Sequence, residues 1–359
     1  MTLPKPKKIQ IERYIEGLSQ FKKIDNLIKL SANESALGPS PRAIEAFERE
    51  KDKIFKYPES DSSSLRDIIS KRFDINAERI ICGAGSDQIF DLTCQLFIEP
   101  GDEVVVTEYG FIMHRIYASL YGAKVLLAKE KNFKASVDEI LKKVTNKTKI
   151  VFVANPNNPT ATYLSKNEML NLRQKLRNDI LLVVDDAYFE FLDKNDFISG
   201  LDLFKDEANV LITRTFSKIY GLAGLRLGWG YSSKEIIDVM YQIKPPFNVN
   251  RAALCSGIEA IRDNEWIKRA IEHNTLWSKK IFSVLKECNI QTNEPTTNFF
   301  LMNFDETKIN SDEAFEKLAD NRLLLRKMMQ YKIPNALRLT IGNKKSNELF
   351  VECIRSIFK

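Results

Sequence analysis

The chain has 359 residues, of which 44% are hydrophobic and 28% charged, a balance typical of a globular protein with a large core. Its net charge of +6 is dispersed, and the densest basic cluster, Lys5 to Lys8, is short and broken by proline, which argues against nucleic-acid binding. The longest apolar runs, such as residues 180–184, are too short to cross a membrane.

The numbers of cysteine and histidine residues indicate the redox compartment of the protein and bear on whether it binds a metal ion. Five cysteines, an odd number without a Cys-x-x-Cys pair, indicate reduced thiols in a cytoplasm rather than a disulfide framework. Only two histidines, His114 and His273, argue against a histidine-based metal site, and we expect no metal. The first residues are basic but lack the apolar segment of a signal peptide.

Residues 1–30 are expected to form an N-terminal arm, with a short amphipathic stretch at 14–17. Ser40 followed by Pro41 predicts the start of a helix, because serine caps helix N-termini and proline suits the first helical position.

Strands and helices alternate through residues 31–243. Short apolar runs predict strands, and two Ser-x-x-Glu capping boxes, at 136–139 and 165–168, predict helix starts. The predicted strands are 79–82, 104–106, 124–127, 150–153, 180–184 and 210–212. This pattern predicts a three-layer α/β/α domain around a mainly parallel sheet.

The pattern changes at about residue 244. Pro245-Pro246 precedes a long helical region, 252–287, which is followed by strand-like segments at 299–302, 323–325 and 337–340. We therefore expect residues 244–359 to form a smaller C-terminal α/β domain.

Four of the predicted strands end in polar clusters, near residues 83, 155, 185 and 213. The strand ends of one parallel sheet meet at one crevice, so these clusters are expected to lie together. Lys218 follows the last strand on glycine-rich, irregular backbone, where a lowered pKa would make it an amine nucleophile. With nearby hydroxyls and Arg226 for a phosphate, this combination describes pyridoxal phosphate. An ordinary solvated lysine remains the alternative.

Residues 217–228, SKIYGLAGLRLG, resemble the cofactor-lysine signature of the aspartate aminotransferase superfamily. Within that superfamily the chain is most similar to the histidinol-phosphate aminotransferases. The resemblance runs from about Tyr14 to Gly342. It implies the fold expected above, a covalent bond between Lys218 and pyridoxal phosphate, and a role for Lys218 in proton transfer.

The resemblance also implies roles for residues around the cofactor ring. Asp185, in Asp-Asp-Ala-Tyr, would pair with the pyridine nitrogen, while Tyr188 and Asn158 would bond the ring hydroxyl. Tyr109 would stack on the ring. From the residues alone, Asp185 could instead cap a helix, and both tyrosines could be core residues.

The phosphate of the cofactor is expected at the start of the helix that follows residue 85, because free N–H groups there bind anions. The residues implied are Ser86, Asp87, Ser217 and Arg226. A plain helix cap is the alternative for the first two.

The loop 155–161 reads NPNNPTA where the family has NPNNPTG. If this position needs a positive φ, Ala161 is strained there. A purely structural turn is the alternative reading of the loop.

Further residues are implied at the rim of the site. Tyr57 would reach the phosphate of a neighbouring subunit, so the resemblance implies a homodimer with shared active sites. Arg338 and Arg326 would bind substrate anions, and Tyr14 and Asn33 would close over the substrate. A loop tyrosine and a salt bridge are the alternatives for Tyr57 and Arg326.

The resemblance implies transfer of an amino group from L-glutamate to a small phosphorylated ketone, such as imidazole acetol phosphate. Two close alternatives are the same chemistry on another phosphorylated amino alcohol and decarboxylation of threonine or serine phosphate. A regulatory protein that keeps the fold is a third, but it would need an added DNA-binding segment, for which the chain leaves no room.

Overall fold

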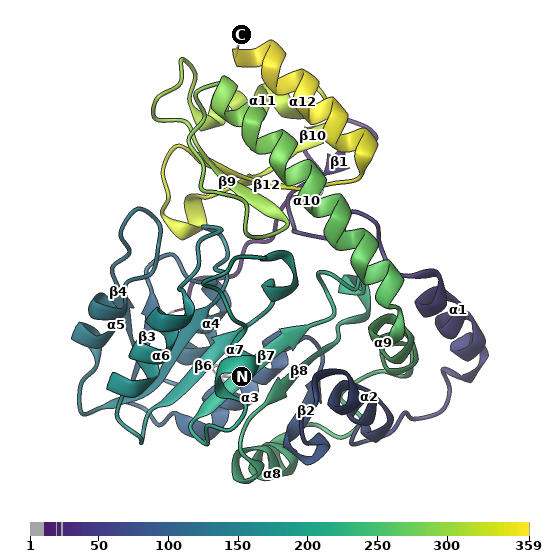
Figure 1. Ribbon diagram of the computed structural model, residues 1–359, viewed down its shortest axis with the longest axis vertical. Coiled ribbons are helices and arrows are strands. Elements are labelled where there is room, and N and C mark those ends of the chain that lie inside the picture. Colours follow the sequence, from purple (N-terminus) through teal and green to yellow (C-terminus); the bar gives the residue numbers. More distant parts are fainter. Residues whose placement is uncertain (1–10, 19, 23, 359) are drawn as a thin grey trace, which may run out of the picture.

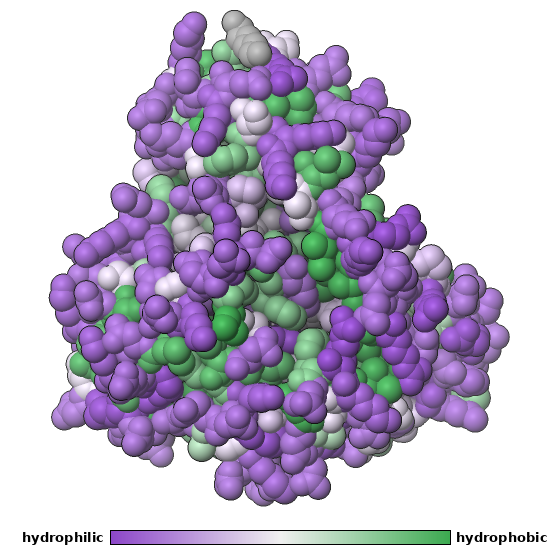
Figure 2. All heavy atoms as spheres, viewed as in Figure 1, coloured by the Kyte–Doolittle hydropathy of each residue, from purple (hydrophilic) through white to green (hydrophobic). Residues whose placement is uncertain are grey.

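The computed structural model describes residues 11–18, 20–22 and 24–358, so the basic cluster at Lys5 to Lys8 lies outside it. Figure 1 shows a broad part at the bottom of the view and a smaller part above it that holds the C-terminus. None of the helices in these ranges is long and apolar enough to cross a membrane. Hydrophilic side chains cover most of the face in Figure 2.

The broad part is built on one sheet. Its strands are β2 (Ile80–Gly83), β3 (Glu103–Thr107), β4 (Lys124–Ala128), β5 (Thr148–Ala154), β6 (Leu181–Asp185), β7 (Val210–Thr215) and β8 (Gly228–Tyr231). In the described chain their order is β2-β8-β7-β6-β5-β3-β4. Every pairing is parallel except those that β8 makes with β2 and β7. The mainly parallel sheet is therefore confirmed.

Successive residues of the central strands pack into opposite layers, as the pleat of a strand requires. On β6, Val183 belongs to the core under one layer, whereas Leu182 and Val184 belong to the other. The first layer holds α3 (Ser86–Phe97), α4 (Ile112–Leu120) and α8 (Lys234–Ile243). The second holds α1 (Pro41–Glu50), α2 (Ser63–Phe73), α5 (Val137–Lys143), α6 (Lys166–Lys175), α7 (Gly200–Phe204) and α9 (Arg251–Arg262). This is the expected three-layer arrangement.

The helix starts follow their sequence signals. Ser40 accepts a hydrogen bond from the backbone N–H of Ala43, and Pro41 opens α1. Ser165 and Glu168 form a complete capping box at α6. At α5 only the serine half forms, with Ser136 accepting from the N–H of Glu139.

The smaller part has its own sheet and core. An antiparallel sheet joins β9 (Phe299–Asn303), β12 (Ala336–Thr340) and β11 (Arg326–Lys327), and a parallel pair joins β1 (Ile28–Lys29) to β10 (Leu323–Leu324). The helices are α10 (Asn264–Glu287), α11 (Ser311–Asp320) and α12 (Lys344–Phe358). Through β1 the expected N-terminal arm adds a strand to this part.

The long helical region expected at 252–287 is two helices. Asp263 interrupts it and accepts a hydrogen bond from the N–H of Trp266, which caps α10. Helix α9 packs beside α1 in the broad part (Figure 1). Ile267 of α10 still belongs to that core, but Ile281 belongs to the core of the smaller part. The domain boundary at 244 stays a prediction, and this packing favours a position within α10.

Strand β8 was not predicted, because its sequence, Gly-Trp-Gly-Tyr, has glycine at alternate positions. The structure explains one of these glycines. A β-carbon at Gly228 would lie 2.3 Å from the backbone nitrogen of Ser86 and 2.6 Å from the carbonyl carbon of Gly85. Only a residue without a side chain lets β8 pass beneath the start of α3.

We expect Gly228→Ala to lower the free energy of unfolding by about 3 kcal/mol, the upper end for overpacking, because the atoms it meets are backbone. Gly224→Ala is the matched control, since a β-carbon at Gly224 meets no atom within 4 Å. Urea unfolding of both variants measures the difference. Equal stability would contradict the close approach.

Candidate active site

The four polar strand ends meet in one cavity of about 270 Å³. Each end contributes lining residues: Ser86 and Asp87; Ala154 and Asn158; Asp185, Ala187 and Tyr188; and Thr215, Ser217 and Lys218. Arg226, Arg326, Arg338, Tyr14 and Asn33 also line it. The structure therefore brings together all the predicted site residues except Tyr109 and Tyr57.

Lys218 presents its amine to this cavity. Its Nζ atom lies 3.4 Å from the carbonyl oxygen of Ala32 and 5.6 Å from the centre of the Tyr188 ring. Burial, and after it the positive charge of Arg338, lowers the pKa of the amine to about 8. A substantial fraction of the amine is then neutral near neutral pH, as a nucleophile toward a carbonyl requires.

Asp185 is held at the end of β6 by three neighbours. Its Oδ1 accepts hydrogen bonds from the N–H of Ala187 (3.2 Å) and the hydroxyl of Thr213 (3.4 Å). Its Oδ2 lies 3.6 Å from Nε2 of His114, a buried histidine on α4. Sequence reasoning gave His114 no role. The available signal was that His114 lies only seven residues after the end of β3, near the edge of the sheet where the polar strand ends meet.

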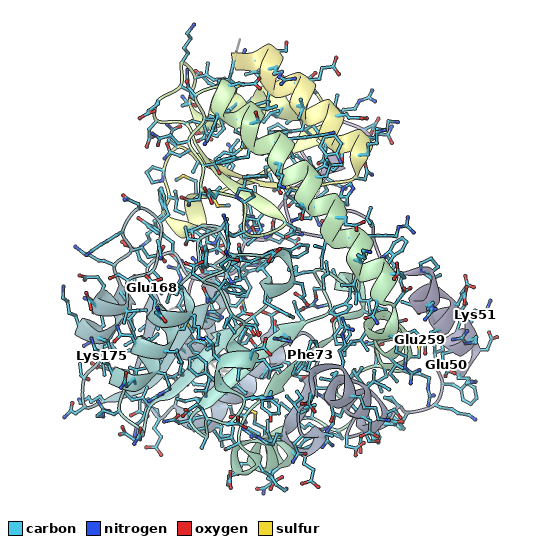
Figure 3. The ribbon with its side chains drawn as sticks, viewed as in Figure 1. Glu50, Lys51, Phe73, Glu168, Lys175 and Glu259 are labelled. Atoms are coloured by element: carbon cyan, nitrogen blue, oxygen red, sulfur yellow. The ribbon has the colours of Figure 1, made fainter. Side chains whose placement is uncertain are left out.

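The neighbouring acid, Asp186, faces away from the cavity. It accepts hydrogen bonds from the N–H groups of Gly200 and Leu201, at the start of α7, and lies 3.4 Å from Arg214. The Arg214 guanidinium packs over the ring of Phe73, which Figure 3 labels, at 4.6 Å. Asp186 therefore has a structural role, in which the two N–H groups and Arg214 compensate its buried charge.

The start of α3 and Arg226 form a cup. Helix α3 begins at Ser86 without a side-chain cap, so its first N–H groups are available to an anion. Arg226 bonds to the hydroxyl of Ser217 (3.3 Å) and to Asp87 (3.2 Å). Asp87 therefore orients the arginine. The cup has the donors that a phosphate needs.

Arg338 connects β12 to the other side of the cavity. Its guanidinium donates to Oδ1 of Asn158 (2.5 Å) and to the carbonyl of Ser31 (2.9 Å), while its Nε has no partner among the described residues. Because Arg338 occupies the Asn158 oxygen, the amide nitrogen of Asn158 is the group left to face a ligand.

Tyr188 is oriented by Asn33. The amide of Asn33 donates to the Tyr188 hydroxyl (3.0 Å), and Thr340 on β12 bonds to Asn33 in turn (3.1 Å). Burial raises the pKa of Tyr188 to about 12, so its hydroxyl keeps a proton to donate into the cavity. The polar atoms of Asn33 are thus engaged within the protein, and its contact with substrate stays a prediction.

Tyr109 lies away from the cavity, and Phe111 lines it instead. The Tyr109 ring packs against Phe133, with 5.5 Å between ring centres, and its backbone N–H donates to Glu130. Stacking of Tyr109 on the cofactor stays untested, but of these two neighbouring aromatics it is Phe111 that lines the cavity. Two aromatics two residues apart could not be separated from the sequence.

The remaining predicted residues lie at the rim or outside. The Tyr14 ring sits over Arg326 at 5.5 Å, and Arg326 also donates to the carbonyl of Ile15 (2.7 Å). Tyr57 is 77% exposed, stacks on Phe247 with 4.5 Å between ring centres, and lies outside this cavity.

Ala161 has a φ of +54°, the conformation that the glycine of the related loop would favour. Its side chain is buried against Tyr188 and Phe299. Burial of the methyl group, about 0.8 kcal/mol, offsets part of the strain of about 1–2 kcal/mol.

The residues present fit pyridoxal phosphate. An uncapped helix start with Ser217 and Arg226 suits the phosphate, a buried carboxylate suits the pyridine nitrogen, and a buried amine suits the aldehyde. Among the described residues there is no cluster of three or more His, Cys, Asp or Glu side chains suited to a metal ion.

The pKa of Lys218 can be tested through the cofactor-free enzyme. Its rate of pyridoxal phosphate uptake should rise with pH through a midpoint near 8, because the neutral amine reacts. A nearby cation disfavours the protonated amine, so Arg338→Leu should move the midpoint to higher pH. Lys218 stays buried in this variant, so the midpoint should remain below the ordinary pKa of a lysine. Arg326→Leu is the control, and an unchanged midpoint in Arg338→Leu would contradict the coupling.

Comparison with known proteins agrees with this geometry. The model of the family "Aminotransferase class I and II" matches residues 25–354. A histidinol-phosphate aminotransferase of Pelagibacter ubique (strain HTCC1062) is 53% identical over 100% of both chains. One of Maricaulis maris (strain MCS10) is 40% identical over 98% of this chain and 97% of its own.

The fold recurs in a crystal structure of histidinol-phosphate aminotransferase from Sinorhizobium meliloti in complex with pyridoxal-5'-phosphate. The TM-score is 0.84 at 21% identity, over 94% of this chain and 99% of that chain. The family match extends over most of the chain and includes every residue that lines the cavity except Tyr14, Glu16 and Gly17. The chain therefore belongs to the aminotransferase class I and II family and is a transferase that depends on pyridoxal phosphate.

Proposed function

We propose that the enzyme transfers an amino group from L-glutamate to imidazole acetol phosphate, with histidinol phosphate as product. The observation that carries the proposal is the presence of Arg338 and Arg326 in the same cavity as the Lys218 amine. This arrangement places two anion-binding groups beside the reacting group, and both substrates carry anions. The full-length identity to histidinol-phosphate aminotransferases supports the choice of acceptor.

The cofactor would be held at each of its functional groups. Ser86, Ser217 and Arg226 bind the phosphate, and Asp87 keeps Arg226 in place. Asp185 would accept a hydrogen bond from the protonated pyridine nitrogen, and His114, on α4, lies 3.6 Å from the carboxylate. The hydroxyl of Tyr188 and the amide nitrogen of Asn158 donate to the ring oxygen. Phe111 is our candidate for the ring face.

When bound, the cofactor supplies an aldehyde for the amino group and a ring that takes up electrons from the substrate Cα. Lys218 would hold the cofactor covalently through its Nζ atom and, when that amine is free, would carry the proton from the substrate Cα. Its lowered pKa suits this work, because a general base acts best when its pKa lies near the working pH. Asp185 keeps the pyridine nitrogen protonated.

The two arginines divide the anions of the substrate. Arg338 faces the cavity beside Asn158, so it is placed for the anion nearest the cofactor. Arg326, on β11, packs against the N-terminal arm, where it lies over the ring of Tyr14 and bonds to the carbonyl of Ile15. We assign it the distal anion, which is the side-chain carboxylate of glutamate or the phosphate of the acceptor. One site can then serve both substrates.

We further propose a homodimer in which Tyr57 reaches the phosphate of the partner's cofactor. Tyr57 lies in an exposed apolar patch with Ile54, Phe55 and Phe247, of which the first two are each 78% exposed. Such patches mark protein interfaces. The patch lies beyond the end of α1, whose last residue, Glu50, is labelled in Figure 3.

Five free cysteines support a reducing, cytoplasmic location.

We expect L-glutamate alone to convert the holoenzyme to its pyridoxamine form. Histidinol phosphate, the product of the proposed reaction, should do the same, because the reaction is reversible. Lys218→Ala should slow both conversions by about 10²–10⁴-fold or more, because the proton carrier is lost. Absorbance during single-turnover mixing measures the rates. Added methylamine should restore part of them.

Decarboxylation is tested in the same experiment with O-phospho-L-threonine. The proposal predicts no carbon dioxide. Release of carbon dioxide, together with no response to glutamate, would replace the transfer reaction by the decarboxylase alternative.

The homodimer is tested by sedimentation, which should give twice the mass of the chain. Tyr57→Phe should weaken cofactor binding by about 10–100-fold, the effect of losing one hydrogen bond to a charged group. Tyr163→Phe is the control, because Tyr163 donates to Asp196 outside the cavity. A monomer, or unchanged affinity in Tyr57→Phe, would count against shared sites.

A further inference from the structure

One acidic side chain in the cavity has no role in the scheme above. Three acids that line the cavity face cationic or titratable partners: Glu34 with Lys29 (3.0 Å), Asp87 with Arg226 (3.2 Å) and Asp185 with His114 (3.6 Å). Glu16 also lines the cavity, and no residue in the described part of the chain makes a hydrogen bond or ion pair with its carboxylate. It is an anion facing a site built for anions.

The backbone on both sides of Glu16 is anchored. Ile15 accepts a hydrogen bond from Arg326 (2.7 Å) and donates one to Gln330 (3.1 Å). On the other side, Gly17 packs so closely under Ser31 that a β-carbon there would lie 2.7 Å from the Ser31 carbonyl oxygen. Glu16 is thus held at the cavity by its neighbours, although its side chain is exposed.

We propose that the Glu16 carboxylate accepts a hydrogen bond from the imidazole ring of the substrate and thereby selects a basic heteroaromatic side chain. This inference rests on the proposed function. Arginines bind the anionic groups of the substrate, so the part left to recognise is the ring, which carries N–H donors. Imidazole has a pKa of about 6.5, and a facing carboxylate favours its charged form.

The same carboxylate disfavours the competing substrates. Threonine phosphate has only a methyl group and anions beyond its amine, so it offers Glu16 no donor. The side-chain carboxylate of glutamate would be repelled by Glu16, and it is directed to Arg326 instead. The arginines bind both substrates, whereas Glu16 distinguishes the imidazole substrate from glutamate.

The test compares two substrates on the holoenzyme: L-histidinol phosphate and the phosphate ester of L-phenylalaninol, in which a phenyl ring replaces the imidazole. In the wild type, kcat/KM should favour the imidazole substrate. In Glu16→Gln that preference should fall by about tenfold, the effect of one hydrogen bond to a charged group, while the reaction with L-glutamate does not slow.

Glu12→Gln is the matched control, because Glu12 lies on the same arm, pairs with Arg115 and does not line the cavity. It should keep the wild-type preference. If the wild type converts histidinol phosphate and Glu16→Gln keeps the full preference, the role of Glu16 is wrong and the proposed function stands. If the wild type responds to glutamate but not to histidinol phosphate, the proposed acceptor is wrong, and the role of Glu16 falls with it.

Discussion

Charge held out of water at one edge of a parallel sheet is the constraint on which the site depends. Asp185 is the last residue of β6 and Lys218 lies three residues after β7, and a buried charged group there is costly unless something compensates it. The Lys218 amine meets that cost through a pKa near 8. Asp185 meets it through Ala187, Thr213 and His114. The same low polarity makes both groups useful, because a neutral amine reacts and a buried carboxylate binds a cation strongly.

The cavity also joins the two parts of the molecule. Arg338 and Thr340 come from a strand of the smaller part, yet they bond to Asn158 and Asn33 and through Asn33 to Tyr188. A movement of the smaller part would therefore shift the groups that we propose to face the cofactor ring. The N-terminal arm is tied into the same network through Ser31 and Arg326. These few hydrogen bonds link the N-terminal arm and the smaller part to the residues of the cavity.

Much of this could be predicted from the sequence, for physical reasons that also explain the misses. Apolar runs and caps located the parallel strands, and the polar strand ends located the cavity. Strand β8 was missed because Gly228 and Gly230 carry no strand signal, only a packing requirement. Phe111 and His114 were missed because the point at which α4 begins decides that Phe111 faces the cavity and that His114 faces Asp185. Asp186 had no visible role, since Arg214 lies 28 positions away in sequence.

The central claim is that Lys218 is the amine to which the cofactor is covalently bonded. Borohydride reduction of the holoenzyme, followed by proteolysis and mass spectrometry of the peptides, tests it directly, because reduction makes the bond permanent. The account predicts the pyridoxyl phosphate mass on the peptide that contains Lys218 and on no other lysine. The label on a different lysine, or no label in a protein that holds the cofactor, would contradict the assignment of the site.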